Sequence, residues 1–373
     1  MYARKYIYER ADWPELSWDE RALHDVLRRV YLERGLLLGK LDALGFEVRD
    51  DAILKSVSAE IVKSSQIEGE FLDITSVRSS VAKKLGIEVA GMIEIFPDHY
   101  TEGVIEMSLD ATQNYAEAVT DERLFGWHTA LFPMGRSGIQ RIRVGAYRTE
   151  SMEIVSGALG KERVHYAAPD ARRVPLEMKR YLKWLNAERD MDPYVKAAIA
   201  HLRFESIHPF DDGNGRIGRA LSDLLLARAE NNPDRYYSLS AQLMAERKEY
   251  YDALEWAQRM SGDVTEWIGW FLGCVCRAME SSTAHINEAA AKARLFERWR
   301  KIPFNERQLD MVNRMIDGFE GKVTSSKWAK ITKCSHDTAL RDINDLVDKG
   351  VLRKSDGGGR STSYVMEAEG GGF

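Results

Sequence analysis

Cysteine and proline are scarce in this chain of 373 residues, which has three cysteines and nine prolines. An odd number of cysteines, in a chain long enough to bury a core, argues against a disulfide framework and favours free thiols in a reducing compartment. Cys274 and Cys276 are separated by one residue rather than by the two of redox and zinc motifs, so we expect buried structural thiols. Nine prolines and 28 glycines also argue against a linker-rich chain.

Long apolar runs and an excess of positive charge are missing as well. The longest apolar run, residues 267–276, is too short to span a bilayer, and the N-terminus lacks an apolar core of signal-peptide length. Lys and Arg number 53 against 58 Asp and Glu, which gives a formal charge of −5. Proteins that bind nucleic acid over most of their surface are usually basic, so this charge argues against that class of protein. The short apolar runs and the free thiols lead us to expect a cytoplasmic protein that enters no membrane.

The remaining composition, 44% hydrophobic and 30% charged, excludes a largely disordered chain, and its richness in Ala, Leu, Glu and Arg indicates a mainly α fold. Apolar positions at helical spacing predict amphipathic helices over 19–47 and 51–68. Gly69 follows the second, where a left-handed cap residue would lie. Segments rich in β-formers at 152–155 and 164–167 flank the loop SGALGKER and predict the only clear hairpin before residue 350.

Residues 303–366 have a pattern of their own. Helical patterns over 305–317, 324–332 and 336–349 precede two short apolar segments that bracket the loop SDGGGRST. Three short helices and a glycine-tipped hairpin outline a winged helix. A DNA-binding regulator is therefore one alternative function, but acids on the third helix would repel phosphates, and we favour a docking or dimerisation module. These acids are Asp337, Asp342, Asp345 and Asp348.

The most informative stretch is HPFDDGNGRIGR, residues 208–219. The residue before a proline avoids the helical region, so His208 should end a helix, where the dipole favours the charged imidazole and would raise its pKa. Gly213 and Gly215 let the backbone approach a ligand closely. Arg216 and Arg219 lie three residues apart, on one face of the next helix.

This combination predicts a phosphate site with a general base. Free N–H groups at a helix start bind anions, and Asp212 can hold Mg²⁺, which in turn holds phosphate oxygens. A histidine beside a polarised phosphate suggests a base that acts on an incoming hydroxyl. A second histidine, His201, with Glu205 nearby, lacks further ligands at metal spacing, so we expect a packed histidine there.

The stretch resembles the motif of the Fic family, HxFx[D/E]GNGRxxR, at every fixed position. Over about 121–260, the resemblance implies a mainly helical Fic fold and transfer of AMP from ATP to a Ser, Thr or Tyr hydroxyl of a target protein. It implies that His208 is the base, Phe210 a buried loop anchor and Asp212 the Mg²⁺ ligand. The implied phosphate-binding residues are Gly213, Asn214, Gly215, Arg216, Ile217, Gly218 and Arg219, with Asn214 and the glycine amides as the anion nest.

The resemblance extends to the flap and the adenine pocket. The predicted hairpin would be the family's flap, which adds to the target backbone as a strand. Its docking residues would be Met152, Glu153, Ile154 and Val155. Tyr251 would stack on adenine and Gln258 would hydrogen-bond it, with simple core packing as the alternative. Tyr147 and Arg148 fit the family pattern, with a packing residue and a structural ion pair as their alternatives.

Ser64, Glu68 and Gly69 fit [S/T]xxxE[G/N], the family's inhibitory-helix signature. Ser64 and Glu68 lie one turn apart, and Glu68 could pair with Arg219 as a bidentate partner. It would then occupy space and charge meant for the γ-phosphate. Because this signature precedes the core, the chain resembles the class with an N-terminal inhibitory helix, whose common bacterial members also carry a C-terminal winged helix.

The expected organisation has five parts. They are an N-terminal arm and helix (1–50), a helical region with the inhibitory helix at about 51–69 (51–120), a Fic catalytic core (121–262), a helical connector (263–302) and a winged-helix domain (303–367). The expected partners are ATP and a target protein, while self-AMPylation and a homodimer stay open. Two alternatives within the enzyme class are removal of AMP from modified proteins by the same site and transfer of a different phosphate-linked group.

Overall fold

The computed structural model describes residues 6–44, 46–89, 91, 93–156, 163–188, 190–259, 262–316, 318–319, 321–355 and 362–367. The chain divides into two compact units, residues 1–286 and 287–373, each with its own hydrophobic core. The long helix α11 (Thr265–Trp299) contains the boundary. Among the described helices, none combines the length and the apolar character that a membrane span requires.

The first unit begins with four helices, α1 (Glu20–Asp42), α2 (Phe46–Ile67), α3 (Ile74–Leu85) and α4 (His99–Gln113), after a short 3₁₀ turn, η1 (Ile7–Glu9). Capping side chains fix their starts: Asp19 accepts hydrogen bonds from the first N–H groups of α1, and Asp73 does so for α3. Gly69, after α2, has φ +85° and is the left-handed residue that the sequence predicted. The expected helices over 19–47 and 51–68 are confirmed, with shifted ends.

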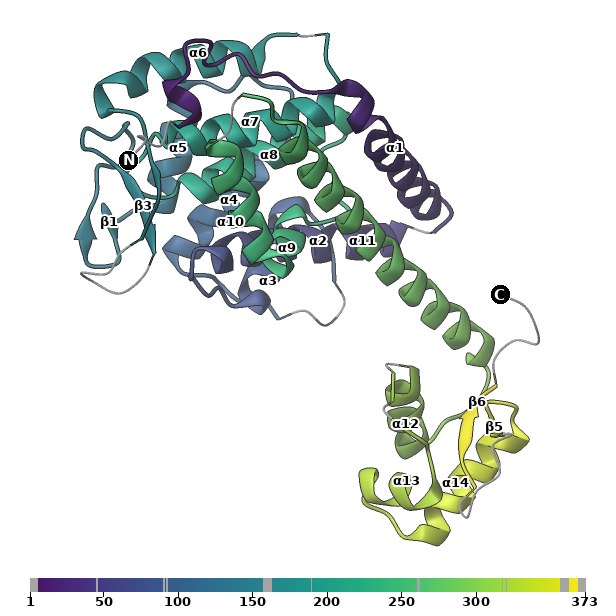
Figure 1. Cartoon of the computed structure of the whole chain (residues 1–373). Helices are drawn as coiled ribbons and strands as arrows, with labels where there is room; N and C mark the ends of the chain where they lie inside the picture. The colour runs from purple at the N-terminus through teal and green to yellow at the C-terminus, as the bar shows by residue number, and fades with distance from the viewer. Residues whose placement is uncertain are drawn as a thin grey trace. The chain divides into compact units, whose positions relative to one another are not determined.

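The centre of this unit is the helix pair α7 (Pro193–Ile207) and α8 (Asn214–Glu230), which lie side by side (Figure 1). Every residue of α7 from Ala197 to Ile207 is buried. Besides α8, it contacts α6 (Val174–Asn186) and α10 (Arg247–Gln258). Next to these, α5 (Asp121–Leu131) contacts α8, η2 (Ala171–Arg173) contacts α6, and α9 (Leu239–Ala245) contacts α2 and α10. The loop between α7 and α8, residues 208–213, is therefore held from both ends by rigid buried helices.

Two antiparallel hairpins flank this loop. One is the predicted hairpin, β3 (Glu153–Ser156) with β4 (Arg163–Ala167); the tip of its loop, residues 157–162, lies outside the described residues. The other, β1 (Arg136–Ser137) with β2 (Gln140–Arg141), shows that the prediction of a single clear hairpin before residue 350 was wrong. Strands of two residues are too short to carry an alternating pattern, so the sequence gives no signal for them.

The second unit contains α12 (Glu306–Ile316), α13 (Ser325–Ile331) and α14 (His336–Asp348), then β5 (Leu352–Lys354) paired with β6 (Tyr364–Met366). This element order is the one that the winged-helix prediction requires, and the loop tip 356–361 lies outside the described residues. The argument from acids on α14 was wrong for one of the four, Asp342, whereas the Asp345 side chain is 47% exposed. Asp342 is buried and paired with Arg307, and Asp345 accepts hydrogen bonds from Gln308 and Lys349.

Candidate active site

His208 is the first residue after α7 and adopts a left-handed conformation, with φ 50° and ψ 64°. The buried Arg148 holds this strained turn: its Nε donates to the His208 carbonyl at 2.8 Å and its backbone N–H donates to the Pro209 carbonyl at 2.9 Å. A third contact reaches the Pro169 carbonyl at 2.6 Å. Arg148 therefore bonds to backbone carbonyls rather than forming the ion pair considered from the sequence, and it fixes where the histidine points.

The imidazole of His208 faces a partly closed site, since its side chain is 17% exposed. Burial lowers the pKa of His208 to about 4, and the positive charge of Arg148 adds to that effect. The expectation that the helix dipole would raise this pKa was wrong, because loss of solvation outweighs the dipole. His208 is consequently neutral at physiological pH and can accept a proton, as a general base must.

The loop after His208 is closed by Asn214. Its side chain bridges Phe210 in both directions: the Phe210 N–H donates to Oδ1, and Nδ2 donates to the Phe210 carbonyl, each at 2.9 Å. The Asn214 side chain is therefore used within the loop, and its backbone N–H, in the first turn of α8, is the group that remains for the predicted anion nest. Phe210 is fully buried, as the resemblance implied for a loop anchor.

His128, on α5, also supports the loop and was not predicted from the sequence. Its ring stacks on Phe210 with centroids 4.4 Å apart. The Gly145 N–H donates to Nδ1 at 3.1 Å, so Nε2 carries the hydrogen and donates to the Asp212 carbonyl at 3.1 Å. Burial lowers the pKa of His128 to about 4, which keeps the ring in this neutral form. Its distance along the chain, 80 residues before the motif, left no local signal.

Asp212 points its carboxylate toward solvent, with 39% of the side chain exposed. It accepts hydrogen bonds from the Ser137 hydroxyl on β1 and from Arg216 at 3.4 Å. The described residues contain no group of three or more His, Cys, Asp or Glu that could hold a metal by themselves. A single exposed carboxylate still fits Mg²⁺, which proteins usually bind through one or two carboxylates together with substrate phosphates.

The start of α8 forms a cradle for an anion. Gly213 has φ +81° and precedes the free N–H groups of the first turn. At Gly215, a Cβ atom would lie 2.2 Å from the Glu68 carboxylate, so only glycine leaves this space open. Ile217 and Gly218 follow within the helix, Ile217 fully buried and Gly218 close to Glu205. The predicted phosphate residues thus lie together, and a carboxylate already occupies the cradle.

That carboxylate is held by Arg219, which is 2% exposed. Arg219 donates to Glu68 Oε1 at 2.8 Å, to the Ser64 hydroxyl at 2.9 Å and to the Ser64 carbonyl at 2.8 Å. Burial alone would lower the pKa of Arg219, but Glu68 beside it raises the value above normal. The structure therefore brings Ser64, Glu68 and Arg219 together, as the sequence predicted, but Arg219 contacts one oxygen of Glu68 and bonds otherwise to Ser64, so the expected bidentate pair is not formed.

The second arginine, Arg216, is 3% exposed and lies 3.4 Å from the Asp212 carboxylate. It donates to the Tyr100 hydroxyl at 2.7 Å, and its guanidinium lies 5.0 Å from the centre of the Phe132 ring. Among the described residues its buried Nε has no hydrogen-bond partner. An arginine held by only one full-strength hydrogen bond retains donors for a phosphate.

The residues predicted for adenine lie on α10. Tyr251 is 38% exposed, and the Arg247 guanidinium lies 5.4 Å from its ring. Burial raises the pKa of Tyr251, and the negative charge of Glu68 adds to this shift while Arg219 opposes it. Gln258 is 4% exposed and lies two turns further along the helix. The structure gives Tyr251 the accessible face that stacking needs, and it gives no equivalent access to Gln258.

The predicted flap presents β3, which pairs only with β4 among the described strands. Ala168 ties the start of the flap by donating to the Met152 carbonyl at 2.9 Å. Glu255 of α10 accepts from Arg163 at 3.0 Å and so anchors β4. The outer edge of β3, along Glu153, Ile154 and Val155, is left to pair with another backbone. Val155 is 48% exposed.

His201 is the packed residue that the sequence analysis expected. It is 1% exposed, and its ring nitrogens contact the Ser222 and Tyr250 hydroxyls, each at 2.8 Å. Burial lowers its pKa to about 3. Tyr147 also packs, on Phe210, and donates to the Asp121 carboxylate.

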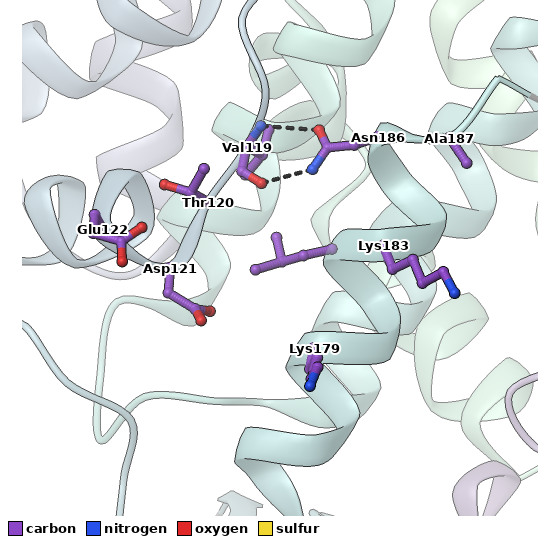
Figure 2. A pocket seen from close by; sticks show the side chains of 9 residues that line it. Val119, Thr120, Asp121, Glu122, Lys179, Lys183, Asn186 and Ala187 are labelled. Carbon is purple, nitrogen blue, oxygen red and sulfur yellow. Dashed lines mark hydrogen bonds between the residues drawn. The ribbon is translucent and has the colours of Figure 1, made fainter.

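Asp121 also lines an open pocket of about 500 Å³ that contains none of residues 208–219 (Figure 2). In this pocket the Asn186 amide bridges the N–H and carbonyl of Val119 at 2.9 and 2.8 Å, while Lys179 and Lys183 lie on α6. Tyr147 links this pocket to the loop 208–213, since it bonds to Asp121 and packs on Phe210.

Comparison with known proteins relates this geometry to a family. Residues 118–226 match the sequence model of the Fic/DOC family, and residues 6–87 match a domain of unknown function, DUF4172. The chain is 28% identical over 256 residues to "Protein adenylyltransferase Fic" of Culex quinquefasciatus, covering 65% of this chain and 45% of that protein. It is 33% identical over 117 residues to the protein of the same name from Drosophila ananassae, covering 31% and 22%. The chain thus spans less than half the length of these relatives.

Solved structures show the same fold. A Fic family protein from Desulfovibrio desulfuricans G20 superposes with a TM-score of 0.54 at 20% identity, covering 96% of this chain and all of that one. A Fic domain containing signaling protein from Bacteroides thetaiotaomicron VPI-5482 superposes with a TM-score of 0.52 at 17% identity, covering 69% of this chain and 98% of that one.

Proposed function

We propose that this chain, whose residues 118–226 belong to the Fic/DOC family, is an autoinhibited protein adenylyltransferase. It would transfer AMP from ATP to a Ser, Thr or Tyr hydroxyl of a target protein. The observation that carries the proposal is the combination of a neutral His208 with an anion site at the start of α8. In that site Gly215 leaves room for the Glu68 carboxylate, which pairs with Arg219. The names of the two relatives described above support this activity.

In the proposed reaction the phosphates of ATP lie over the first turn of α8. Arg216 and Arg219 neutralise the distal phosphates, and Asp212 would hold Mg²⁺, which screens charge on the phosphates. His208 takes the proton of the target hydroxyl while a bond forms between that oxygen and the α-phosphorus. The bond from the α-phosphorus to the bridging oxygen breaks, and diphosphate leaves.

The target would dock as an added strand on β3, through the backbone of Glu153 to Val155. Its hydroxyl would then lie beside the loop that carries His208. The flap and this loop are joined by Arg148, whose guanidinium donates to the carbonyl of Pro169, just after the flap, and to the carbonyl of His208. Tyr251 would stack on the adenine ring. The free thiols fit the cytoplasmic location that the sequence predicts, and the second unit is proposed as a docking or dimerisation module.

Autoinhibition follows from the place of Glu68. Its carboxylate occupies the space over Gly215 and the guanidinium of Arg219, both of which the γ-phosphate needs. ATP that binds with Glu68 in place would carry its phosphates in a displaced pose, and near-attack geometry affects rates by orders of magnitude.

The purified protein and its Glu68→Gly variant test this function directly. Each is incubated with Mg²⁺ and ATP that carries the label on the α-phosphate or on the γ-phosphate, with a mixture of candidate proteins and with the enzyme as its own acceptor. We expect incorporation from α-labelled ATP only, a mass gain of one AMP group, and none with His208→Ala. Incorporation from the γ-phosphate would instead indicate a kinase-like transfer. Release of AMP from a modified protein, without incorporation, would favour the reverse activity.

A further inference from the structure

A buried carboxyl group lies directly beneath the candidate base. Glu205, on the last turn of α7, is 5% exposed, and its Oε2 lies 3.8 Å from Nδ1 of His208. Its other oxygen, Oε1, is buried and has no hydrogen-bond partner among the described residues. A buried polar atom without a partner costs free energy, so this arrangement is not explained by stability.

The neighbouring helix leaves room for this oxygen. A Cβ atom on Gly218 would lie 2.4 Å from Glu205 Oε1, so a larger residue at 218 would displace the carboxyl group. Glu68 reaches the same helix at Gly215, where a Cβ would lie 2.2 Å from its carboxylate. The two glycines are three residues apart and share one face of α8, so both carboxyl groups contact the helix that carries Arg219.

Of Glu205 and His208, Glu205 is the residue that changes its protonation state close to neutral pH. Burial raises the pKa of Glu205 to about 8; Arg219 opposes this shift, and the negative charge of Glu68 adds to it. The proton therefore resides on Glu205 rather than on His208 near neutral pH, and it leaves as the pH rises through about 8. The charged and titratable groups around Glu205 are Arg219, Glu68, His208, Tyr181, Tyr250 and Tyr251.

We propose that Glu205 is a positioning residue for His208, and that its ionised form stabilises the imidazolium that His208 becomes during transfer. In that step the O–H bond of the target breaks and an N–H bond forms on His208, as oxygen bonds to the α-phosphorus and diphosphate leaves. Ionised Glu205 exchanges no atom and supplies one negative charge 3.8 Å from the ring. The kinetic consequence rests on the proposed function, whereas the electrostatic coupling of the two side chains does not.

The same geometry links Glu205 to inhibition. Because the charge of Glu68 raises the pKa of Glu205, withdrawal of Glu68 from the cradle lowers that pKa. The carboxyl group then ionises at a lower pH, and the ionised form makes His208 a stronger base. Displacement of the inhibitory carboxylate would therefore free the phosphate site, and it lowers the pKa of Glu205 until a phosphate brings negative charge back to the cradle.

The coupling is tested on the full chain by NMR of ¹⁵N-labelled histidines, with the His208 signals assigned by their loss in His208→Ala. In the wild type we expect the His208 ring signals to shift across a transition near pH 8, and in Glu68→Gly at a lower pH. In Glu205→Gln this transition should vanish. The matched control is Glu177→Gln, another buried carboxyl, held by Trp13 and Arg173 away from the loop; it should leave the transition unchanged. A transition that persists in Glu205→Gln, or is absent from the wild type, overturns the inference.

The kinetic test uses the Glu68→Gly background and measures AMP transfer from pH 6 to 9. With Glu205 present, kcat should rise about ten-fold through the same transition, while KM for ATP stays constant. With Glu205→Gln the profile should be flat, and Glu205→Asp should restore part of the rise. A flat profile with Glu205 present refutes the role in catalysis. Absence of all AMP transfer refutes the proposed function instead, and the NMR titration still decides whether Glu205 acts on His208.

Discussion

Removal of the Glu68 carboxylate is the perturbation whose size the structure predicts best. An exposed ion pair contributes up to about 1 kcal/mol, and breaking a fully buried one costs about 3–5 kcal/mol. The pair with Arg219 is intermediate, because the Glu68 side chain is 30% exposed and Arg219 only 2%. A value of about 2 kcal/mol leaves Arg219 free in roughly 3% of molecules, so Glu68→Gly should raise the transfer rate up to about 30-fold.

The assay compares initial rates of AMP transfer at saturating ATP and Mg²⁺. Glu70→Gly is the matched control, since this acid lies two residues further along the chain, is exposed and is not paired with Arg219. The double variant Glu68→Gly with Arg219→Ala should be slower than Glu68→Gly alone, because the γ-phosphate then lacks its partner. A Glu68→Gly rate within two-fold of the wild type, or equal activation by Glu70→Gly, would refute the reasoning.

Four further outcomes follow from the site. His208→Ala should slow transfer by about 10²–10⁴ while ATP affinity, measured by calorimetry, changes little. Asp212→Ala should abolish the dependence of the rate on Mg²⁺ with an unfolding free energy within about 0.5 kcal/mol of wild type, since the side chain is 39% exposed and lies outside the hydrophobic core. Arg247→Ala removes the 2.8 Å hydrogen bond to the last carbonyl of α2 and should activate transfer about five-fold in the same rate assay. The folded-state pKa of Glu205, about 8, lies above its ordinary 4.5, so wild-type stability relative to Glu205→Gln should fall between these pH values, by up to about 5 kcal/mol, in thermal melts.

The sequence predicted the members of the site well, because most of them lie in one stretch of twelve residues. Local rules were sufficient there: the proline after His208 ends α7, and the spacing of Arg216 and Arg219 follows from the helix period. The contact between Glu68 and Arg219, 151 residues apart, was predicted only through the resemblance to a family signature. The helix pattern alone would have left Glu68 as a solvated acid.

The errors arose where the surroundings, rather than the local sequence, decide the property. The helix dipole at His208 is a local effect, whereas the burial that lowers its pKa comes from elements distant in sequence. The side chain of Asn214 closes the loop on Phe210, a task that its place next to the glycines did not indicate. His128 and Ser137 contact Asp212 from other parts of the chain, and no spacing rule relates them to it.

The cradle on α8 also restricts how this site can be switched on. The space above Gly215 that would admit a phosphate is the space that Glu68 occupies, since a Cβ there would lie 2.2 Å from the carboxylate. Any side chain at 215 that expels Glu68 would exclude the phosphate as well. Relief of inhibition therefore requires that the segment carrying Glu68, directly after α2, moves or is lost. The end of α2 is held by the hydrogen bond from Arg247 to Ile67 and by those from Arg219 to Ser64 and Glu68, and such a movement must break the bond to Glu68.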